Sequence, residues 1–180
     1  EVFDYGADVI FQADDLPLCK TPLVTDVDDL AKIKRWDPLT SVRMLDRIRA
    51  VELFRQEMGK EYPILGWIEG PWAEFTDLTT VSEGMMMTYD DPDAVKETMN
   101  LIADQAIDCA IAQVRAGADV IGMGDAAASL MSPDFYEEFL FPLHQRIFKA
   151  IHAEGAITKL HICGDINGIL PMMVNTGSDI

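Results

Sequence analysis

Apolar residues recur at helical spacing over a long stretch in the second half of the chain. Between Asp93 and Ala116 they fall three or four positions apart and form one stripe, made of Val95, Met99, Ile102, Ala106, Ala110 and Val114. Such a stripe is typical of a helix with one buried face. The pattern therefore predicts a long helix over this range.

Similar signals predict several further helices. Ser132, Pro133 and Asp134 suit a helix start as N-cap, first-turn proline and an acid matched to the helix dipole. That helix is expected to run toward Gly155. Other helices are expected at about Thr40 to Met58, just after Gly70 and Pro71, and at about Ile169 to Asn175.

Short strand-like runs alternate with these helices, and a glycine precedes most of them. "GADVI" occurs at Gly6–Ile10 and again at Gly117–Ile121, while "EGAITKL" starts at Glu154 and "TGSDI" at Thr176. Each glycine can end a helix with a positive φ just before a strand. Another strand is expected over Tyr62–Ile68. Strands that alternate with helices form parallel sheets, so the predicted fold class is α/β.

The choice within this class lies between an open doubly wound sheet and a (βα)8 TIM barrel. "GMGDAA", Gly122–Ala127, has alanine where the third glycine of a dinucleotide-binding loop belongs. The barrel is therefore favoured. Such barrels take roughly 250 residues, and about five strands can be counted. We expect residues 1–180 to be part of one barrel domain, an incomplete internal fragment of about five βα units truncated at both ends, with an irregular excursion from Asp14 to Asp37.

The composition indicates which environment and which binding partners suit this protein. The chain has 49% apolar residues, and its 14 basic and 31 acidic side chains give a net charge of −17. This charge disfavours nucleic acid and anionic membranes as partners. The three cysteines are too few and too scattered for a disulfide framework. With no long apolar run or signal-like start, the sequence predicts a soluble, cytoplasmic protein.

The stretch "KLHICGD", Lys159–Asp165, is the strongest chemical signal. In a strand His161 and Cys163 would point to one face, and their aliphatic neighbours to the other. Gly164 marks the carboxyl end of the strand, where barrel enzymes hold their sites. Imidazole and thiolate suit zinc, but a catalytic zinc needs about three protein ligands. A core strand that contains both residues by chance is the alternative.

Carboxylates follow the other predicted strands. Asp125 ends "VIGMGD", Glu69 is the last residue but one of "LGWIEG", and Asp14 and Asp15 end "VIFQADD". In a parallel barrel these ends meet at one rim, so Asp125 and Glu69 are candidate catalytic residues. Loop acids that serve only solubility are the alternative.

Three segments resemble one known family. "EGPWAEFTDL", "GADVIGMGDAAASLMSPDFYEEFLFP" and "LHICGD" are similar to the uroporphyrinogen decarboxylase superfamily, and "HICG" resembles its cobamide-dependent branch, the methylcobalamin:coenzyme M methyltransferases. The likeness runs from about Tyr62 to the end. It implies a TIM barrel in which zinc activates a thiol that accepts a methyl group from a corrinoid.

The resemblance also implies roles for individual residues. His161 and Cys163 take the places of zinc ligands, and the family's more distant cysteine has no counterpart here. Our own hypothesis, beyond the resemblance, is that Asp125 and Glu69 either complete the zinc shell or orient the acceptor. Cofactor contacts are assigned to Gly70, Trp72, Gly164 and Asp165. The implied partners are a corrinoid protein or free methylcobalamin as donor, and a small thiol or a pterin as acceptor.

Other conspicuous residues are interpreted as structural. Cys109 lies beside the apolar stripe of its helix and is expected in the core of the protein. No role is assigned to Cys19. His144 and His152 are expected on the helix surface. Either Trp67 or Trp72 could stack on a flat ring, although an aromatic wall is the more ordinary use.

Two rival functions stay open. One is uroporphyrinogen decarboxylation without a metal, which needs basic groups for the substrate's carboxylates. From Tyr62 onward the basic residues are few, and just one of them, Lys159, could point inward; the set is Lys96, Arg115, Arg146, Lys149 and Lys159. The other is a non-catalytic barrel that binds a corrinoid or a partner protein.

Overall fold

A computed structural model describes residues 1–15 and 17–180. The first part of the chain forms a small antiparallel ribbon, a short 3-10 helix and one long helix. These elements are β1 (Val9–Ile10), β2 (Leu18–Cys19), η1 (Val27–Lys32) and α1 (Val42–Met58). The segment from Asp14 to Asp37 is thus largely irregular, as its prolines and acids predict.

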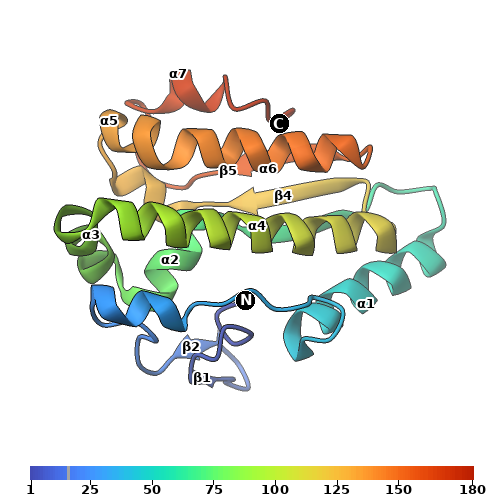
Figure 1. Ribbon diagram of the computed structural model, residues 1–180. Helices are drawn as coiled ribbons and strands as arrows, with labels where there is room; N and C mark the ends of the chain where they lie inside the picture. Colours follow the sequence, from blue (N-terminus) through green and yellow to red (C-terminus); the bar gives the residue numbers. More distant parts are fainter. Residues whose placement is uncertain (16) are drawn as a thin grey trace.

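The second part alternates strands and helices in the order β3 (Leu65–Glu69), α2 (Pro71–Thr79), α3 (Val81–Asp90), α4 (Pro92–Ala116), β4 (Val120–Gly124), η2 (Ala126–Leu130), α5 (Pro133–Phe135), η3 (Tyr136–Leu140), α6 (Phe141–Ala153), β5 (Ile157–His161) and α7 (Leu170–Met173). In Figure 1 the long helices α4 and α6 run side by side along the strands.

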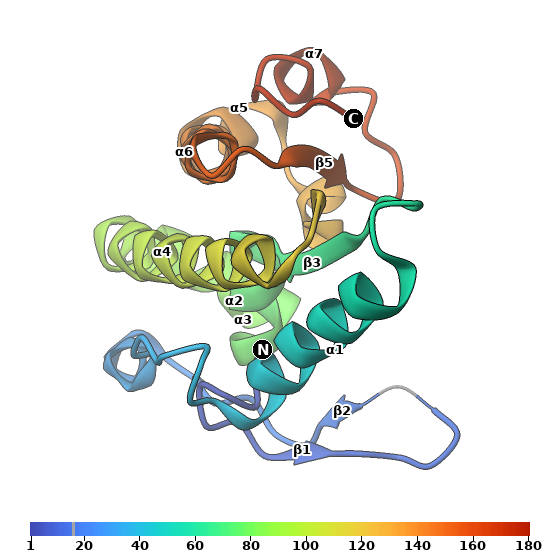
Figure 2. The same ribbon diagram turned by 90° about the vertical axis from the view of Figure 1, so that its right-hand side faces the viewer.

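Strands β3, β4 and β5 form a parallel sheet in that order. Each crossover passes through a long helix, as parallel pairing requires. Figure 2 shows α4 and α6 on the same side of the strands, so both helices cover one face of the sheet. The predicted α/β class with a parallel sheet is confirmed.

Alternating side chains give this sheet two different faces. On the face toward the helices, Ile68, Ile121 and Met123 are fully buried. On the opposite, inner face, Leu65 and Ile157 at the start of the strands are each 47% exposed. The inner face is therefore partly exposed where the strands begin, although Val120 between these two residues is buried.

Helix α4 shows how the sequence fixes an element. Asp91 caps it by accepting a hydrogen bond from the amide of Ala94 at 3.0 Å, and Pro92 fills the first turn. Gly117 ends it with φ of 118°, which few other residues adopt. The predicted apolar stripe is the buried face of the helix, and Cys109 lies within it as expected.

Three expectations about the elements need correction. "GADVI" at Gly6–Ile10 does not join the parallel sheet, because β1 pairs with β2 in a separate antiparallel ribbon. Among the described residues, the parallel sheet therefore consists of the three strands β3, β4 and β5. The helix expected from Ser132 to Gly155 is interrupted by the π-helical turn Tyr136–Leu140, just before Pro142. Proline lacks an amide donor, so a change in the hydrogen-bond pattern there is physically reasonable.

The segment "TGSDI" lies beside β5, as its strand-like pattern predicts. The amide of Leu160 donates to the carbonyl of Ile180 at 2.8 Å, and the amide of Ile180 donates to Thr158 at 3.1 Å. In the described residues, no helix is long and apolar enough to cross a membrane.

Candidate functional site

One row of residues crosses the sheet at the carboxyl ends of its strands. Glu69 of β3 pairs in register with Gly124 of β4, which pairs with His161 of β5. Because residues in register on parallel strands point to the same face, Glu69 and His161 both project from the inner face. Gly124 has no side chain, so it leaves space between them.

The chain around His161 shows the alternation that the sequence predicts. His161 and Cys163 are exposed, whereas Ile162 between them is buried at 7% exposure. The two donor atoms therefore belong to the accessible side of this segment, and Ile162 anchors it in the core. Among the described residues, no cluster of three or more histidine, cysteine or acidic side chains has the geometry of a metal site. His161 and Cys163 thus offer two donors of the kind that zinc prefers.

The indole of Trp67 covers the middle strand on the inner face. A Cβ atom placed on Gly122 would lie 2.5 Å from Cε3 of Trp67, and one on Gly124 would lie 2.7 Å from its Cζ2. Both contacts are too short for any real side chain. Because Gly122 and Gly124 carry no side chain, the indole ring can pack against β4. The centroid of the ring lies 6.3 Å from that of the His161 imidazole.

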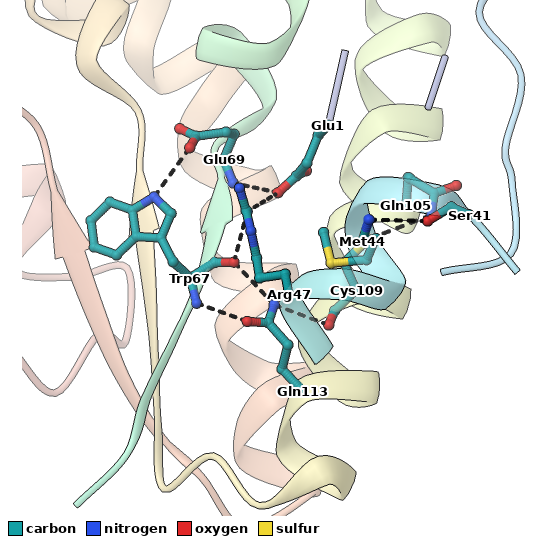
Figure 3. A network of polar contacts seen from close by, with 9 residues as sticks. All are labelled: Glu1, Ser41, Met44, Arg47, Trp67, Glu69, Gln105, Cys109 and Gln113. Carbon is teal, nitrogen blue, oxygen red and sulfur yellow. Dashed lines mark hydrogen bonds and ion pairs between the residues drawn. The ribbon is translucent and has the colours of Figure 1, made fainter. Parts of the chain in front are cut away.

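Hydrogen bonds fix the backbone and the ring of Trp67 (Figure 3). The amide group of buried Gln113 pairs with both its N–H and its carbonyl, each at 3.0 Å, and Arg47 donates to the same carbonyl at 3.3 Å. The indole Nε1 donates to Oε1 of Glu69 at 3.2 Å. These hydrogen bonds hold the backbone of Trp67 in place, and its indole in turn orients the Glu69 carboxylate.

Glu69 has an altered acidity. Burial raises its pKa from 4.5 to about 7, and the neighbouring carboxylate of Glu1 adds to the increase, while Arg47 opposes it. The backbone amide of Glu69 also donates to Oε1 of Glu1 at 3.2 Å. A carboxyl group that titrates near neutrality can hold or release a proton there, which is the behaviour expected of a site residue.

Asp125 has a different position from the one predicted. Its carboxylate is fully buried, accepts the Ala73 amide at 2.7 Å through Oδ1, and lies 2.8 Å from Nε2 of His144 through Oδ2. Nδ1 of His144 is 2.9 Å from the hydroxyl of Tyr136. The carboxylate of Asp125 is therefore buried behind the rim, and its catalytic role stays a prediction. Its backbone amide nevertheless donates to the carbonyl of His161 at 3.0 Å, which ties this buried group to the end of β5.

His144 is the residue that sequence reasoning misplaced. It was expected on the helix surface, but its side chain is fully buried, whereas His152 is exposed as expected. A signal for this was present, because His144 follows Leu140 by four positions and precedes Phe148 by four. It therefore lies on the apolar stripe of the helix.

Two residues predicted as cofactor contacts, Trp72 and Gly70, are buried, and their assignment stays a prediction. Trp72 is fully buried against Phe75 and Phe135, with ring centroids 5.6 Å and 5.0 Å away, so its ring presents no surface to a ligand. Gly70 is buried as well, and a Cβ there would lie 2.4 Å from Cβ of Asp125. Its role is close packing, and Trp67 is the tryptophan that reaches the inner face.

The other predicted rim residues are accessible. Gly164 has φ of 102°, and a Cβ there would lie 2.7 Å from Oγ of Ser129. Asp165 is exposed and accepts hydrogen bonds from the backbone and side chain of Asn167 at 3.1 Å and 2.8 Å. Both stay predictions as cofactor contacts. Asp14 and Asp15 lie between β1 and β2, which form a sheet separate from the parallel one.

Comparison with known proteins identifies the family. The family model described as uroporphyrinogen decarboxylase (URO-D) matches residues 2–180. The methylcobamide:CoM methyltransferase MtaA of Methanosarcina barkeri is 36% identical over 132 residues, which are 72% of this chain and 38% of that protein. MtbA of Methanosarcina mazei is 32% identical over 86% of this chain and 45% of its own. A uroporphyrinogen decarboxylase of a Nostoc species is 29% identical over 91% of this chain and 48% of its own.

The fold has a counterpart among solved structures. A methyltransferase from Methanosarcina mazei superimposes with a TM-score of 0.87 and 30% identity, covering 98% of this chain and 52% of the other. The chain thus spans about half the length of these relatives. The predicted fold, part of a (βα)8 barrel, and the stated resemblance are both confirmed. The chain belongs to the uroporphyrinogen decarboxylase family.

Proposed function

We propose that the full-length protein transfers a methyl group from a methylated corrinoid to a thiol acceptor, with a zinc ion held by His161 and Cys163. The observation that supports this most directly is the exposed pair of donors at the end of β5, with Ile162 buried between them. Relatives named as methylcobamide:CoM methyltransferases support the same reaction class.

The donor set fits the metal. A neutral imidazole nitrogen and a thiolate sulfur are common zinc ligands, and a catalytic site leaves one position open for a substrate. When bound there, zinc would lower the pKa of the acceptor thiol and so supply a thiolate at neutral pH.

The residues of the inner face would hold the acceptor. The indole of Trp67 supplies an apolar floor, and Glu69, with Oε1 engaged by that indole, would orient the acceptor beside His161. In the transfer, the sulfur electron pair forms the new S–C bond and the electron pair of the C–Co bond stays with cobalt. The thiol proton leaves to solvent, so no outside oxidant or reductant is needed.

The first test addresses zinc. His161→Ala in the full-length protein should lose stoichiometric bound zinc, measured by atomic absorption after dialysis, because one of the donors is gone. His152→Ala is the matched control, since His152 is exposed on α6. Equal zinc content in both variants would refute the ligand assignment.

The second test addresses the reaction. Methylcobalamin is offered with a panel of thiols and with tetrahydrofolate as a pterin acceptor, and demethylation is followed by absorbance. Turnover with a thiol supports the proposal. Turnover with the pterin alone would change the acceptor class, and no turnover with any acceptor would favour a non-catalytic barrel.

Uroporphyrinogen decarboxylation is the second candidate, because decarboxylases are also among the relatives. It is disfavoured by the inner face, where Lys159 is the one basic residue on the described strands β3 to β5. A substrate with many carboxylates requires several cations. Carbon dioxide release from uroporphyrinogen by the full-length protein would reverse this preference.

A further inference from the structure

We propose that His144 is a positioning residue for the candidate metal donors His161 and Cys163. It acts through the buried carboxylate of Asp125, which fixes the segment against which these donors lie. The inference rests on the proposed function and assigns a role to a residue outside the donor set. It states what the buried group of Asp125, His144 and Tyr136 does beyond stability.

The donor segment is held at two points by the residues that follow β4. Near its start, the carbonyl of His161 accepts a hydrogen bond from the backbone amide of Asp125 at 3.0 Å. Near its end, Gly164 packs on Ser129 of η2, since a Cβ atom on this glycine would lie 2.7 Å from the serine Oγ. Between these two points, the described backbone forms no hydrogen bond with another backbone group. The start of η2 therefore helps to set where both donors lie.

The side chain of Asp125 supplies a cap that helix α2 lacks. Gly70 is the N-cap residue of α2 and has no side chain, whereas Oδ1 of Asp125 accepts the amide of Ala73 in the first turn at 2.7 Å. A Cβ atom on Gly70 would lie 2.5 Å from Cγ of Asp125, so the carboxylate fills the space that a local cap would need. The positive end of the helix dipole favours an ionised carboxylate there. One oxygen of Asp125 thus joins the end of β4 to α2.

His144 satisfies the second oxygen of this carboxylate. Its Nε2 lies 2.8 Å from Oδ2 of Asp125, and both side chains are fully buried. An ionised carboxylate only accepts, so Nε2 carries the proton and donates. In the neutral ring Nδ1 is then an acceptor, and the hydroxyl of Tyr136 lies 2.9 Å from it. The three side chains therefore form one directed chain of hydrogen bonds, from Tyr136 through His144 to Asp125.

The π turn Tyr136–Leu140 brings Tyr136 and His144 to the same side of the helix. Positions eight apart in a regular α-helix lie about 80° apart around the axis, because each residue turns by about 100°. A π turn takes up one extra residue, so this spacing corresponds to about two regular turns. The two rings accordingly lie 5.5 Å apart between centroids. Such π turns occur frequently at functional sites.

Stability alone does not require this polar group. A buried carboxylate is costly unless its oxygens are paired, and apolar side chains of similar volume often stabilise a core as well or better. The surroundings are apolar, since the ring of buried Phe148 lies 6.3 Å from that of His144 between centroids. A fully paired chain of hydrogen bonds in such a core specifies one arrangement of its members. We therefore attribute the group to positioning.

The test compares His144→Gln with His144→Met in the full-length protein. These two side chains have similar length, but only glutamine carries an N–H group that can donate to Asp125. In metal-free protein, NMR measures amide hydrogen exchange of Asp125 and of buried Ala106 in α4. In His144→Met the Asp125 amide should exchange about tenfold faster relative to Ala106, because its hydrogen bond to β5 opens more often. His144→Gln should stay within about threefold of the parent.

Zinc binding gives a second readout. Its dissociation constant, measured by competition with a chelator, should rise about tenfold or more in His144→Met, as expected when the support of a metal ligand is lost. In His144→Gln it should return to within about threefold of the parent value. His152→Met, at an exposed position of the same helix, is the control and should change neither quantity.

Failure of this inference is distinguishable from failure of the proposed function. A parent protein that binds no zinc refutes the metal site, whereas exchange of the Asp125 amide in metal-free protein still tests the positioning. Equal exchange of this amide, relative to Ala106, in His144→Met and His144→Gln would overturn the inference. Where the parent binds zinc, equal zinc affinity of these two variants would also overturn it. So would nitrogen NMR of the parent that places the ring proton of His144 on Nδ1.

A milder variant covers the case in which His144→Met does not fold. Tyr136→Phe removes only the hydroxyl that donates to His144. It should raise the relative exchange of the Asp125 amide and the zinc dissociation constant by about threefold each. No rise in either quantity would overturn the inference.

Discussion

Nε2 of His144 lies 2.8 Å from Oδ2 of Asp125, and neither side chain is exposed. This contact joins helix α6 to the end of β4. The other carboxylate oxygen of Asp125 accepts the Ala73 amide near the start of α2, so one buried carboxylate connects three elements. The carboxyl end of β4 is thereby fixed, and the backbone amide of Asp125 links it to the carbonyl of His161 at 3.0 Å.

His144→Leu should destabilise the protein strongly. The substitution leaves Oδ2 of Asp125 and the hydroxyl of Tyr136 buried without their present partner, at a cost of about 2–4 kcal/mol in the free energy of unfolding. Urea denaturation followed by circular dichroism measures this. His152→Leu, on the exposed side of the same helix, should cost less than about 1 kcal/mol. Similar losses in the two variants would contradict a special role for the buried contact.

Gly70→Ala tests the close packing against Asp125. The new Cβ would lie 2.4 Å from Cβ of Asp125, so the backbone must shift, and we expect a loss of about 1–3 kcal/mol. Gly168→Ala is the control, because there the nearest atom is Cγ of Pro133 at 3.2 Å. Thermal unfolding of both variants gives the comparison. A stable Gly70→Ala would show that this approach is not as tight as the contacts indicate.

Glu69 should make stability depend on pH near neutrality. Its pKa is raised from 4.5 to about 7, so the folded protein holds this proton more tightly than the unfolded chain. The stabilisation is complete below about pH 4.5 and is lost as pH rises through about 7. Glu69→Gln should therefore lose less stability than the parent between pH 5 and about pH 8. Urea midpoints at the two pH values measure this, with exposed Glu83→Gln as control.

Asp179 should contribute to stability in acid. The Thr158 amide donates to its carboxylate at 2.8 Å, and hydrogen bonds from Thr158 and His152 lower its pKa from 3.8 to about 2. The contribution is present above pH 3.8 and disappears as pH falls through about 2. Asp179→Asn should flatten the acid side of the stability profile, measured by circular dichroism. Asp134→Asn, at an exposed helix start, should keep the parent profile.

The sequence alone predicted those structural elements whose signals lie within a few neighbouring residues. Helical spacing and the flanking Gly117 predicted helix α4 from Asp93 to Ala116, one residue short of its observed start at Pro92, because apolar stripes and helix ends are local signals. The alternation predicted for this stretch likewise agrees with the burial of Ile162 between the exposed His161 and Cys163. Pairing partners of the short run at Gly6–Ile10 were not predictable, since antiparallel and parallel neighbours suit the same apolar residues.

Tertiary structure decided which polar residues are available to a ligand. Glu69 ends β3 and Asp125 follows β4, yet Asp125 turns toward His144 in the interior while Glu69 stays on the inner face. Trp67 and Trp72 are five positions apart, and the glycines of β4 let Trp67 alone lie on the inner face. The sequence determines the chemistry of each side chain and the spacing of the apolar residues. Burial depends on contacts between segments that are distant in the sequence, and no local pattern contains these contacts.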